Sequence, residues 1–248
     1  MQRAELDSYL EHYLEVARFS DYCPNGLQVE GGERVERIVT GVTASLELLT
    51  AAIAANAQAV IVHHGYFWKG EDLRVVGVRR RRLALLLENN LNLYAFHLPL
   101  DAHIEVGNNA ALARVLGLSI EGRCGEHDLV FHGRADVDMS LSDVAARISQ
   151  RLERDPLVIG DMMRPVKRIA WCTGAAQGYF EDAIRAGVDV YVSGEISEQT
   201  VHLARESGVA YIAAGHHATE RYGVQALGAH LAQRFALEHQ HIDIANPV

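Results

Sequence analysis

The feature that most constrains the fold of this chain is an internal repeat. Residues 35–65 (VERIVTGVTASLELLTAAIAANAQAVIVHHG) align without gaps with residues 166–196 (VKRIAWCTGAAQGYFEDAIRAGVDVYVSGEI). In each copy a short apolar run, a helical stretch and a second apolar run follow one another, which is typical of two parallel strands joined by a helix. A chance resemblance between two such units is the alternative. The repeat favours an internal duplication that gives two similar α/β lobes.

The flanking segments complete this prediction. Apolar spacing predicts helices at residues 5–18, 82–89, 108–117 and 141–154, and a strand at residues 92–96. Between residues 119 and 140 the sequence breaks into short β-like pieces, which marks a domain junction. We therefore expect an α/β fold of mostly parallel sheets flanked by helices, with lobes at residues 1–122 and 123–248 and a metal site between the lobes.

Composition excludes several classes of protein. Of the 248 residues 49% are hydrophobic and 22% charged, which suits a globular protein, and the net charge of −9 argues against a broad nucleic-acid-binding face. No apolar run approaches the roughly 20 residues of a membrane span. Cys23, Cys124 and Cys172 form no CxxC pair, so neither a disulfide framework nor a cysteine zinc site is expected. The N-terminus does not resemble a signal peptide, and we expect a cytoplasmic location.

Histidines and acids cluster where the predicted strands end. The pair at residues 63 and 64 closes one apolar strand, an H-x3-D motif follows the next, and an H-x3-E motif follows a strand at residues 210–214. Ligands of open parallel sheets gather at the carboxyl ends of strands. Each motif alone is common, but three at strand ends predict a metal site among the side chains of His63, His64, His97, Asp101, His216 and Glu220.

Imidazole and carboxylate donors suit zinc, manganese, iron or nickel better than magnesium or calcium. Two such divalent ions, about 3.5–4 Å apart, can share a water and lower its pKa. The sequence thus predicts two divalent metal ions per subunit.

Several segments resemble one known family. They are DYCPNGLQVEG (21–31), GVTAS (41–45), VIVHHGYFWKG (60–70), HLPLDAH (97–103), GNNA (107–110), SGEISEQT (193–200) and AAGHHATERYG (213–223). They are similar to the GTP cyclohydrolase 1 type 2 homologues, the Nif-three-like dinuclear metal proteins, in their short bacterial form. The resemblance spans nearly the whole chain. It implies His63, His64, Asp101, His216 and Glu220 as the metal ligands, with Glu220 as a bridge, and a toroidal homohexamer.

The resemblance also implies a metal-dependent hydrolase that opens the imidazole ring of GTP or of another nucleotide and releases formate. In that interpretation His97 or Glu195 moves protons. The alternatives are a metal-binding or interaction scaffold without turnover, or another two-metal phosphoesterase or amidohydrolase. Whether His97 itself binds metal is open, and Glu195 alternatively caps the next helix.

Two secondary features remain open. The four arginines at residues 79–82 either attract the phosphates of a nucleotide or form a solvated turn. Tyr66, Phe67 and Trp68 either stack on a purine base or pack in a subunit contact.

Overall fold

The computed structural model describes all residues from 1 to 248, and these form two compact units. The first contains Met1–Gly107 and Gly223–Ala245, and the second contains Asn108–Tyr222 and Asn246–Val248. This division differs from the predicted boundary at 122/123. The reason lies in two helices: residues 108–116 pack in the core of the second unit, whereas residues after 223 pack in the core of the first.

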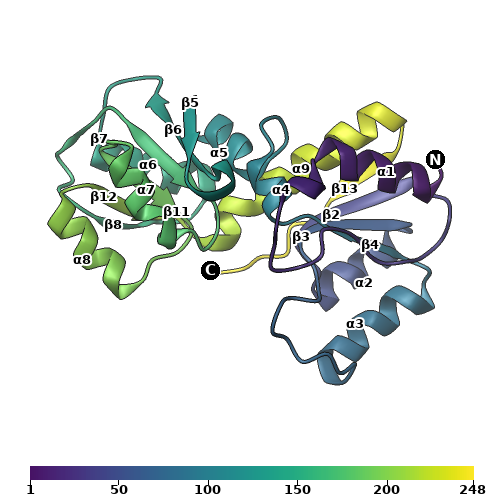
Figure 1. Ribbon diagram of the computed structural model, residues 1–248. Helices are drawn as coiled ribbons and strands as arrows, with labels where there is room; N and C mark the ends of the chain where they lie inside the picture. Colours follow the sequence, from purple (N-terminus) through teal and green to yellow (C-terminus); the bar gives the residue numbers. More distant parts are fainter. The chain divides into compact units, whose positions relative to one another are not determined.

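The first unit is built on a five-stranded sheet whose strands have the order β1-β4-β3-β2-β13 (Figure 1). Only β1 pairs in the antiparallel sense. In that order the strands are Gly26–Val29, Asn92–Ala95, Ala59–His64, Arg37–Thr43 and Glu238–His241. The two outer strands were not predicted, because β1 lies in a segment rich in turn residues and β13 is polar.

Helices cover both faces of this sheet. Side chains alternate along each strand, so Ile38 faces α1 and the C-terminal part of α9, whereas Val39 faces α2 and α3. The four helices are Arg3–Tyr13, His216–Phe235, Leu46–Ala54 and Gly77–Glu88, and the short α4 is Leu98–Ala102. The unit therefore has three layers, and the carboxyl ends of β2, β3 and β4 share one edge.

Two helix ends differ from the prediction. The first helix stops at Tyr13, because Glu15 adopts a left-handed backbone (φ 51°) before a 3-10 turn at Val16–Arg18. α3 begins at Gly77 instead of residue 82. The start of α2 is capped, since the Ser45 hydroxyl accepts a hydrogen bond from the Leu48 amide at 3.1 Å.

The second unit contains a six-stranded sheet with the order β5-β6-β10-β11-β12-β8. Only β10, β11 and β12 are parallel to one another, and the outer strands pair in the antiparallel sense. The α/β class is confirmed, with a more mixed second sheet than the sequence indicated. In that order the strands are Leu118–Cys124, Val130–Ala135, Ile169–Cys172, Val190–Ser193, Ala210–Ala213 and Leu157–Ile159.

Helices also cover both faces of the second sheet. Trp171 and Val192 pack with α5 and α6, whereas Tyr191 and Tyr211 form an aromatic group with Phe180 of α7. The helices of this unit are α5 (Asn108–Leu116), α6 (Leu141–Leu152), α7 (Phe180–Arg185) and α8 (Glu198–Ser207). Smaller elements are the pair β7 (Met139–Ser140) and β9 (Pro165–Val166), and 3-10 turns at Glu126–Asp128 and Gln177–Tyr179.

The repeat extends to backbone register. Ile38 pairs with Ala59 in the first unit, and Ile169 pairs with Val190 in the second, a shift of 131 residues in both strands. The same shift relates Gln58 to Asp189, whose side chains accept hydrogen bonds from backbone amides at residues 36–37 and 167–168 respectively. Two segments of different sequence thus make the same strand–helix–strand unit. In both, one side chain before the second strand accepts two backbone amides that precede or begin the first strand.

α9 contributes residues to both units, through Tyr222 to the second and from Gly223 to the first. Polar and charged residues occur along its length. None of the helices combines the length and the apolar character that crossing a membrane requires.

Candidate metal centre

His63 and His64 form the last two residues of β3, as predicted. The His63 ring is fully buried, and its Nδ1 donates a hydrogen bond to the Phe96 carbonyl at 2.9 Å. Because a carbonyl only accepts, this bond fixes the proton on Nδ1, so Nε2 is the ring nitrogen that carries the lone pair. The His64 ring lies 4.5 Å from the His63 ring, with its Nδ1 3.2 Å from the Thr43 hydroxyl.

Asp101 lies on α4, which follows β4 after a single turn. Its buried carboxylate approaches the Nε2 side of the His63 ring, with Oδ1 3.5 Å from Nε2. Pro99 near the start of α4 favours the helical backbone that directs Asp101 inward. The local sequence HLPLD therefore places a carboxylate beside the imidazole at the end of β3.

His97 is held by an acid that the motif analysis did not single out. Its Nδ1 donates to Asp21 Oδ1 at 2.8 Å, and its backbone amide donates to the Asn25 side chain at 2.7 Å. The other Asp21 oxygen accepts the Leu98 amide at 3.0 Å. Asp21 precedes His97 by 76 residues, so no local spacing could indicate this pair; the segment DYCPN was the only signal.

The carboxylate of Asp21 stays ionised over a wide pH range. Burial raises its pKa, but hydrogen bonds from His97, Asn25 and Leu98 outweigh that effect and lower it to about 2. A carboxylate on Nδ1 orients the His97 ring and directs Nε2 toward other groups. The ring nitrogens of His63, His64 and His97 lie within 4.8 Å of one another, so the first unit assembles a three-histidine group.

The second unit brings together His216 and Glu220 on the first turn of α9. Their spacing of four residues places them on one helix face, with His216 Nε2 3.1 Å from Glu220 Oε2. His216 Nδ1 lies 2.7 Å from Glu195, which follows β11. Burial lowers the pKa of His216, but hydrogen bonds and attraction from Glu220 and Glu195 raise it to about 9.

A glycine beside this pair makes room for the Glu220 carboxylate. A Cβ at Gly174 would lie 2.0 Å from Glu220 Oε1 and 3.3 Å from His216 Nε2, and its φ of +69° is unfavourable for other residues. The Gly174 amide donates to the Thr219 hydroxyl at 3.0 Å, which ties this turn to α9. Glycine at this position therefore lets the Glu220 carboxylate lie directly against the backbone of residue 174.

These donor sets fit divalent metal ions. Each unit offers imidazole nitrogens beside a buried carboxylate, and each predicted histidine except His64 has its Nδ1 held by a carbonyl or a carboxylate. That arrangement is common in metal-binding histidines. The five predicted ligands thus fall into two groups, with His63, His64 and Asp101 in the first unit and His216 and Glu220 in the second.

Two residues close in sequence to these groups, His103 and Cys23, have structural surroundings of their own. His103 supports the fold rather than Asp101: its Nε2 donates to the Tyr13 carbonyl at 3.0 Å and its Nδ1 accepts the Glu105 and Val106 amides. Cys23 is buried, and desolvation together with nearby Asp21 raises its thiol pKa to about 12, so it is no reactive nucleophile.

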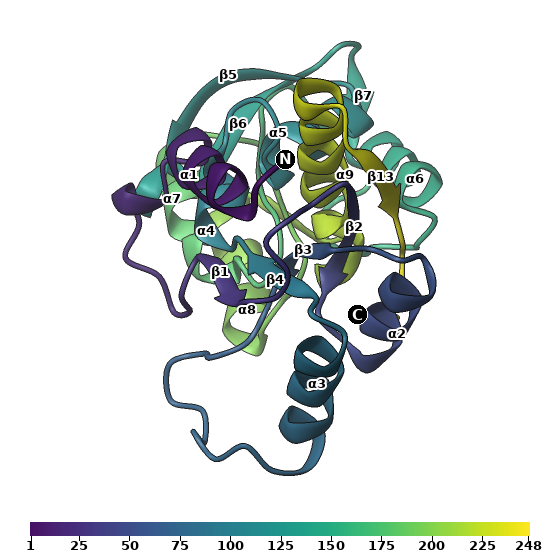
Figure 2. The same ribbon diagram turned by 90° about the vertical axis from the view of Figure 1, so that its right-hand side faces the viewer.

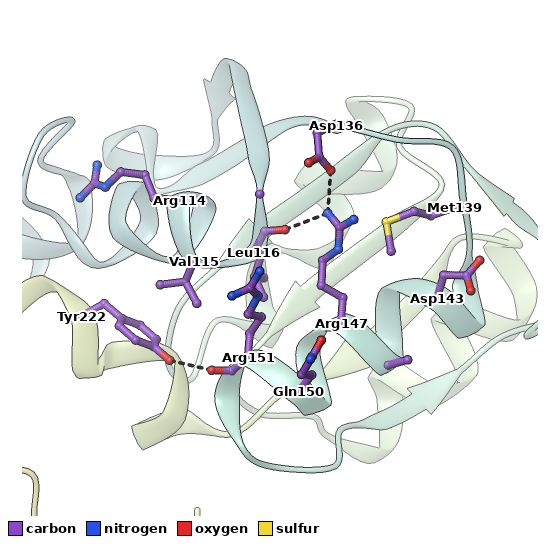
Figure 3. A pocket seen from close by; sticks show the side chains of 12 residues that line it. Arg114, Val115, Leu116, Asp136, Met139, Asp143, Arg147, Gln150, Arg151 and Tyr222 are labelled. Atoms are coloured by element: carbon purple, nitrogen blue, oxygen red, sulfur yellow. Dashed lines mark hydrogen bonds and ion pairs between the residues drawn. The ribbon is translucent and has the colours of Figure 1, made fainter.

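Two cavities were not predicted from sequence. In the first unit a cavity of about 240 Å³ is lined by His64, Trp68, Arg79 and Arg82. In the second unit a cavity of about 700 Å³ lies between α5 and α6 (Figure 3). In Figure 3 Arg147 bonds to Asp136 and to the Leu116 carbonyl, and none of the predicted ligands lines this cavity.

Known proteins resemble this chain over its whole length. A "GTP cyclohydrolase 1 type 2 homolog" of Pseudomonas aeruginosa is 58% identical over 96% of this chain and 95% of that protein. One of Escherichia coli, with the same name, is 50% identical over the full length of both.

Solved structures agree. One described as "protein ybgI, unknown function" is 49% identical, with a TM-score of 0.96 and full coverage of both chains. A protein from Thermus thermophilus is 36% identical, with a TM-score of 0.90 and full coverage of both chains. The model of the family Duf34/NIF3 (NGG1p interacting factor 3) matches residues 1–247. This chain belongs to the Duf34/NIF3 family.

Proposed function

We propose that this protein is a metal-dependent hydrolase with a dinuclear centre held by His63, His64, Asp101, His216 and Glu220. The observation that carries the proposal is the way its histidines are fixed. His63 and His216 each have Nδ1 bound to a hydrogen-bond acceptor and Nε2 beside a carboxylate. Buried imidazole–carboxylate sets of this kind are costly unless a cation or proton compensates them.

Two bound divalent ions would lower the pKa of a water molecule and so supply a nucleophile at neutral pH. The residues of the chain have separate tasks around them. Phe96 and Glu195 orient the rings of His63 and His216 through Nδ1. Asp21 orients His97, whose Nε2 is then the site that accepts and returns a proton. In this proposal Glu195 acts chiefly by holding His216, and His97 carries the proton.

The proposed substrate is a nucleotide, and the named candidate reaction is opening of the GTP imidazole ring with release of formate. The names of the curated relatives support this choice. The test is formate release from GTP by the protein loaded with zinc, manganese, iron or nickel. A loaded protein that releases no formate would refute this reaction but not the metal centre. Panels of phosphate esters and amides then test the other two-metal hydrolases.

The metal centre has its own test. Elemental analysis of the isolated protein should find two divalent ions per chain, and the variant Glu220→Ala should lose most of them. Glu206→Ala on the exposed surface of α8 is the matched control and should retain both. Equal metal content in all three proteins would refute the ligand assignment.

A scaffold without turnover is the second candidate. The segment before α3 exposes Leu73, Val75 and Val76, which suits contact with another protein chain. We propose that such contacts build a homohexameric ring, and light scattering gives its mass. Loss of assembly together with loss of metal in Glu220→Ala, with no turnover in the wild type, would favour the scaffold over the enzyme.

A further inference from the structure

The cavity beside His64 contains more positive charge than its own contacts neutralise. It has a volume of about 240 Å³ and lies in the first unit, between the end of β3 and the first turns of α3. Figure 2 shows α3 and the long segment that precedes it. Its charged and aromatic lining residues are His64, Tyr66, Trp68, Glu71, Arg79 and Arg82.

The two arginines of this cavity differ in their partners. Arg79 is fully engaged, since its guanidinium binds the Glu71 carboxylate and the Asp72 carbonyl. Arg82 makes neither a hydrogen bond nor an ion pair, and its Nε is buried without an acceptor. A buried donor without an acceptor is unfavourable, and more so when the group is charged. Arg82 is therefore a donor that a ligand can satisfy.

The aromatic ring of Tyr66 helps to hold the guanidinium of Arg82 in position. Its Cζ lies 5.7 Å from the centroid of the Tyr66 ring. Tyr66 is in turn anchored, because its hydroxyl donates to the Ala44 carbonyl at 2.7 Å and its amide donates to Gln28 at 2.6 Å. Stacking of this kind holds the guanidinium plane while leaving its edge available.

The arrangement of α3 adds to the positive potential. Arg79 and Arg82 are three residues apart and line the cavity, whereas Arg80 and Arg81 are exposed outside it. No acidic residue lies in the first turn of α3, where the helix dipole is itself positive. Four arginines in this position are unfavourable for the helix alone, and an anion bound there would offset their repulsion.

We propose that this cavity is an anion subsite that binds a phosphoryl group of the substrate, with Arg82 as its principal donor and Trp68 as its apolar wall. The proposal rests on the proposed function, because it takes His64 as part of the metal centre. A volume of about 240 Å³ suits a phosphate or diphosphate and is below the roughly 300–1,000 Å³ of sites that enclose whole ligands. The cavity therefore recognises only the anionic end of a larger molecule.

The test compares two single-charge variants of the same helix. Binding of inorganic pyrophosphate, GTP and guanosine is measured by calorimetry on metal-free protein, so that phosphate cannot bind through the metals. We expect pyrophosphate and GTP to bind the wild type and guanosine to bind at least tenfold more weakly. Arg82→Gln should weaken pyrophosphate binding about tenfold or more, whereas Arg81→Gln, which removes the same charge from an exposed position, should change it less than twofold.

Two results would overturn the subsite: metal-free wild type that binds no pyrophosphate, or equal losses in the two variants, which would indicate diffuse attraction to α3. Thermal unfolding of both variants shows whether Arg82→Gln stays folded, and Arg82→Lys, which keeps the charge, should retain part of the affinity. Metal content after reloading is the independent readout. If the wild type takes up no metal while the Arg82 effect persists, the proposed function fails and the subsite does not.

Discussion

The two units orient an equivalent histidine with different residues. In both, a histidine after the third parallel strand of the repeat has its Nδ1 bound to a carboxylate: His97 to Asp21 in the first unit, and His216 to Glu195 in the second. Asp21 comes from the segment before β1, whereas Glu195 comes from the repeat itself, at the position equivalent to His64. Both units thus have a carboxylate that orients this histidine, although the carboxylate comes from different parts of the chain.

The differences around these pairs indicate different tasks. The Asp21 side chain is 2% exposed and the Glu195 side chain 36%. Where the first unit has His63, the second has Gly194, at which a Cβ would lie 2.7 Å from the His216 Cα. The second unit therefore gives up one imidazole to let the backbone of α9 approach. In the proposed centre, these two histidines have different tasks: His216 is a metal ligand, and His97 moves protons.

The sharpest test of this asymmetry replaces the two equivalent histidines. His216→Ala should lower metal affinity about 100-fold or more, because it removes a ligand, and His97→Ala should lower it less than threefold while abolishing turnover. Affinity is measured by competition with a chromophoric chelator. Equal losses of metal affinity in the two variants would refute this difference in roles and indicate that His97 is also a ligand.

Acid stability tests the pair in the first unit. The folded state lowers the pKa of Asp21 from 3.8 to about 2, so the folded protein binds fewer protons than the unfolded chain. Its contribution is fully present above pH 3.8 and disappears as the pH falls toward 2, about 2 kcal/mol in all. Denaturant titrations between pH 5 and 2 should show this loss in the wild type and not in Asp21→Asn. The exposed Asp138→Asn should behave as the wild type does.

Local patterns in the sequence predicted much of this comparison. The motif HH closes β3, and the motifs HLPLD and HHATE begin shortly after β4 and β12, so strand-end geometry predicts where His63, Asp101 and Glu220 lie. The link between His97 and Asp21 could not be predicted, because it depends on how a loop closes over β4. The register also aligns the third strands of the two copies: Ile61 pairs with Tyr94 and Val192 with Ile212, so Tyr94 corresponds to Ile212.

Arg82 illustrates a second limit of sequence patterns. Four consecutive arginines cannot share one helix face, which favoured a solvated turn. Because α3 begins at Gly77, Arg79 and Arg82 instead share the face that lines the cavity. Prediction of that face required the helix start, which no capping side chain marks.

Removal of Glu195, the carboxylate that orients His216, should lower metal affinity moderately. Glu195→Ala leaves the Nδ1 of His216 without its partner, and loss of such a partner typically lowers metal affinity 10–100-fold. We expect about tenfold, since Glu195 is partly exposed and water replaces it in part. Glu195→Gln, which keeps an acceptor oxygen, should lose less. An unchanged affinity in Glu195→Ala would mean that the carboxylate serves another purpose.

The smallest expected effect tests the repeat itself. Gln58 accepts the amides of Glu36 and Arg37 at 3.1 and 2.8 Å, and Asp189 accepts those of Lys167 and Arg168 at 2.8 and 2.9 Å. Alanine at either position should lower the free energy of unfolding by about 1 kcal/mol, with the larger loss at Asp189 because its acceptor is charged.

Chemical denaturation measures both losses, and Asp189→Asn should recover part of the second, since an amide oxygen still accepts. A loss at one position only would show that the matching register arises from strand pairing alone. Equal sensitivity would mean that both copies need a side chain at this position to close the turn before the second strand. This side-chain contact would then be part of the shared architecture that brings a histidine to the end of each sheet.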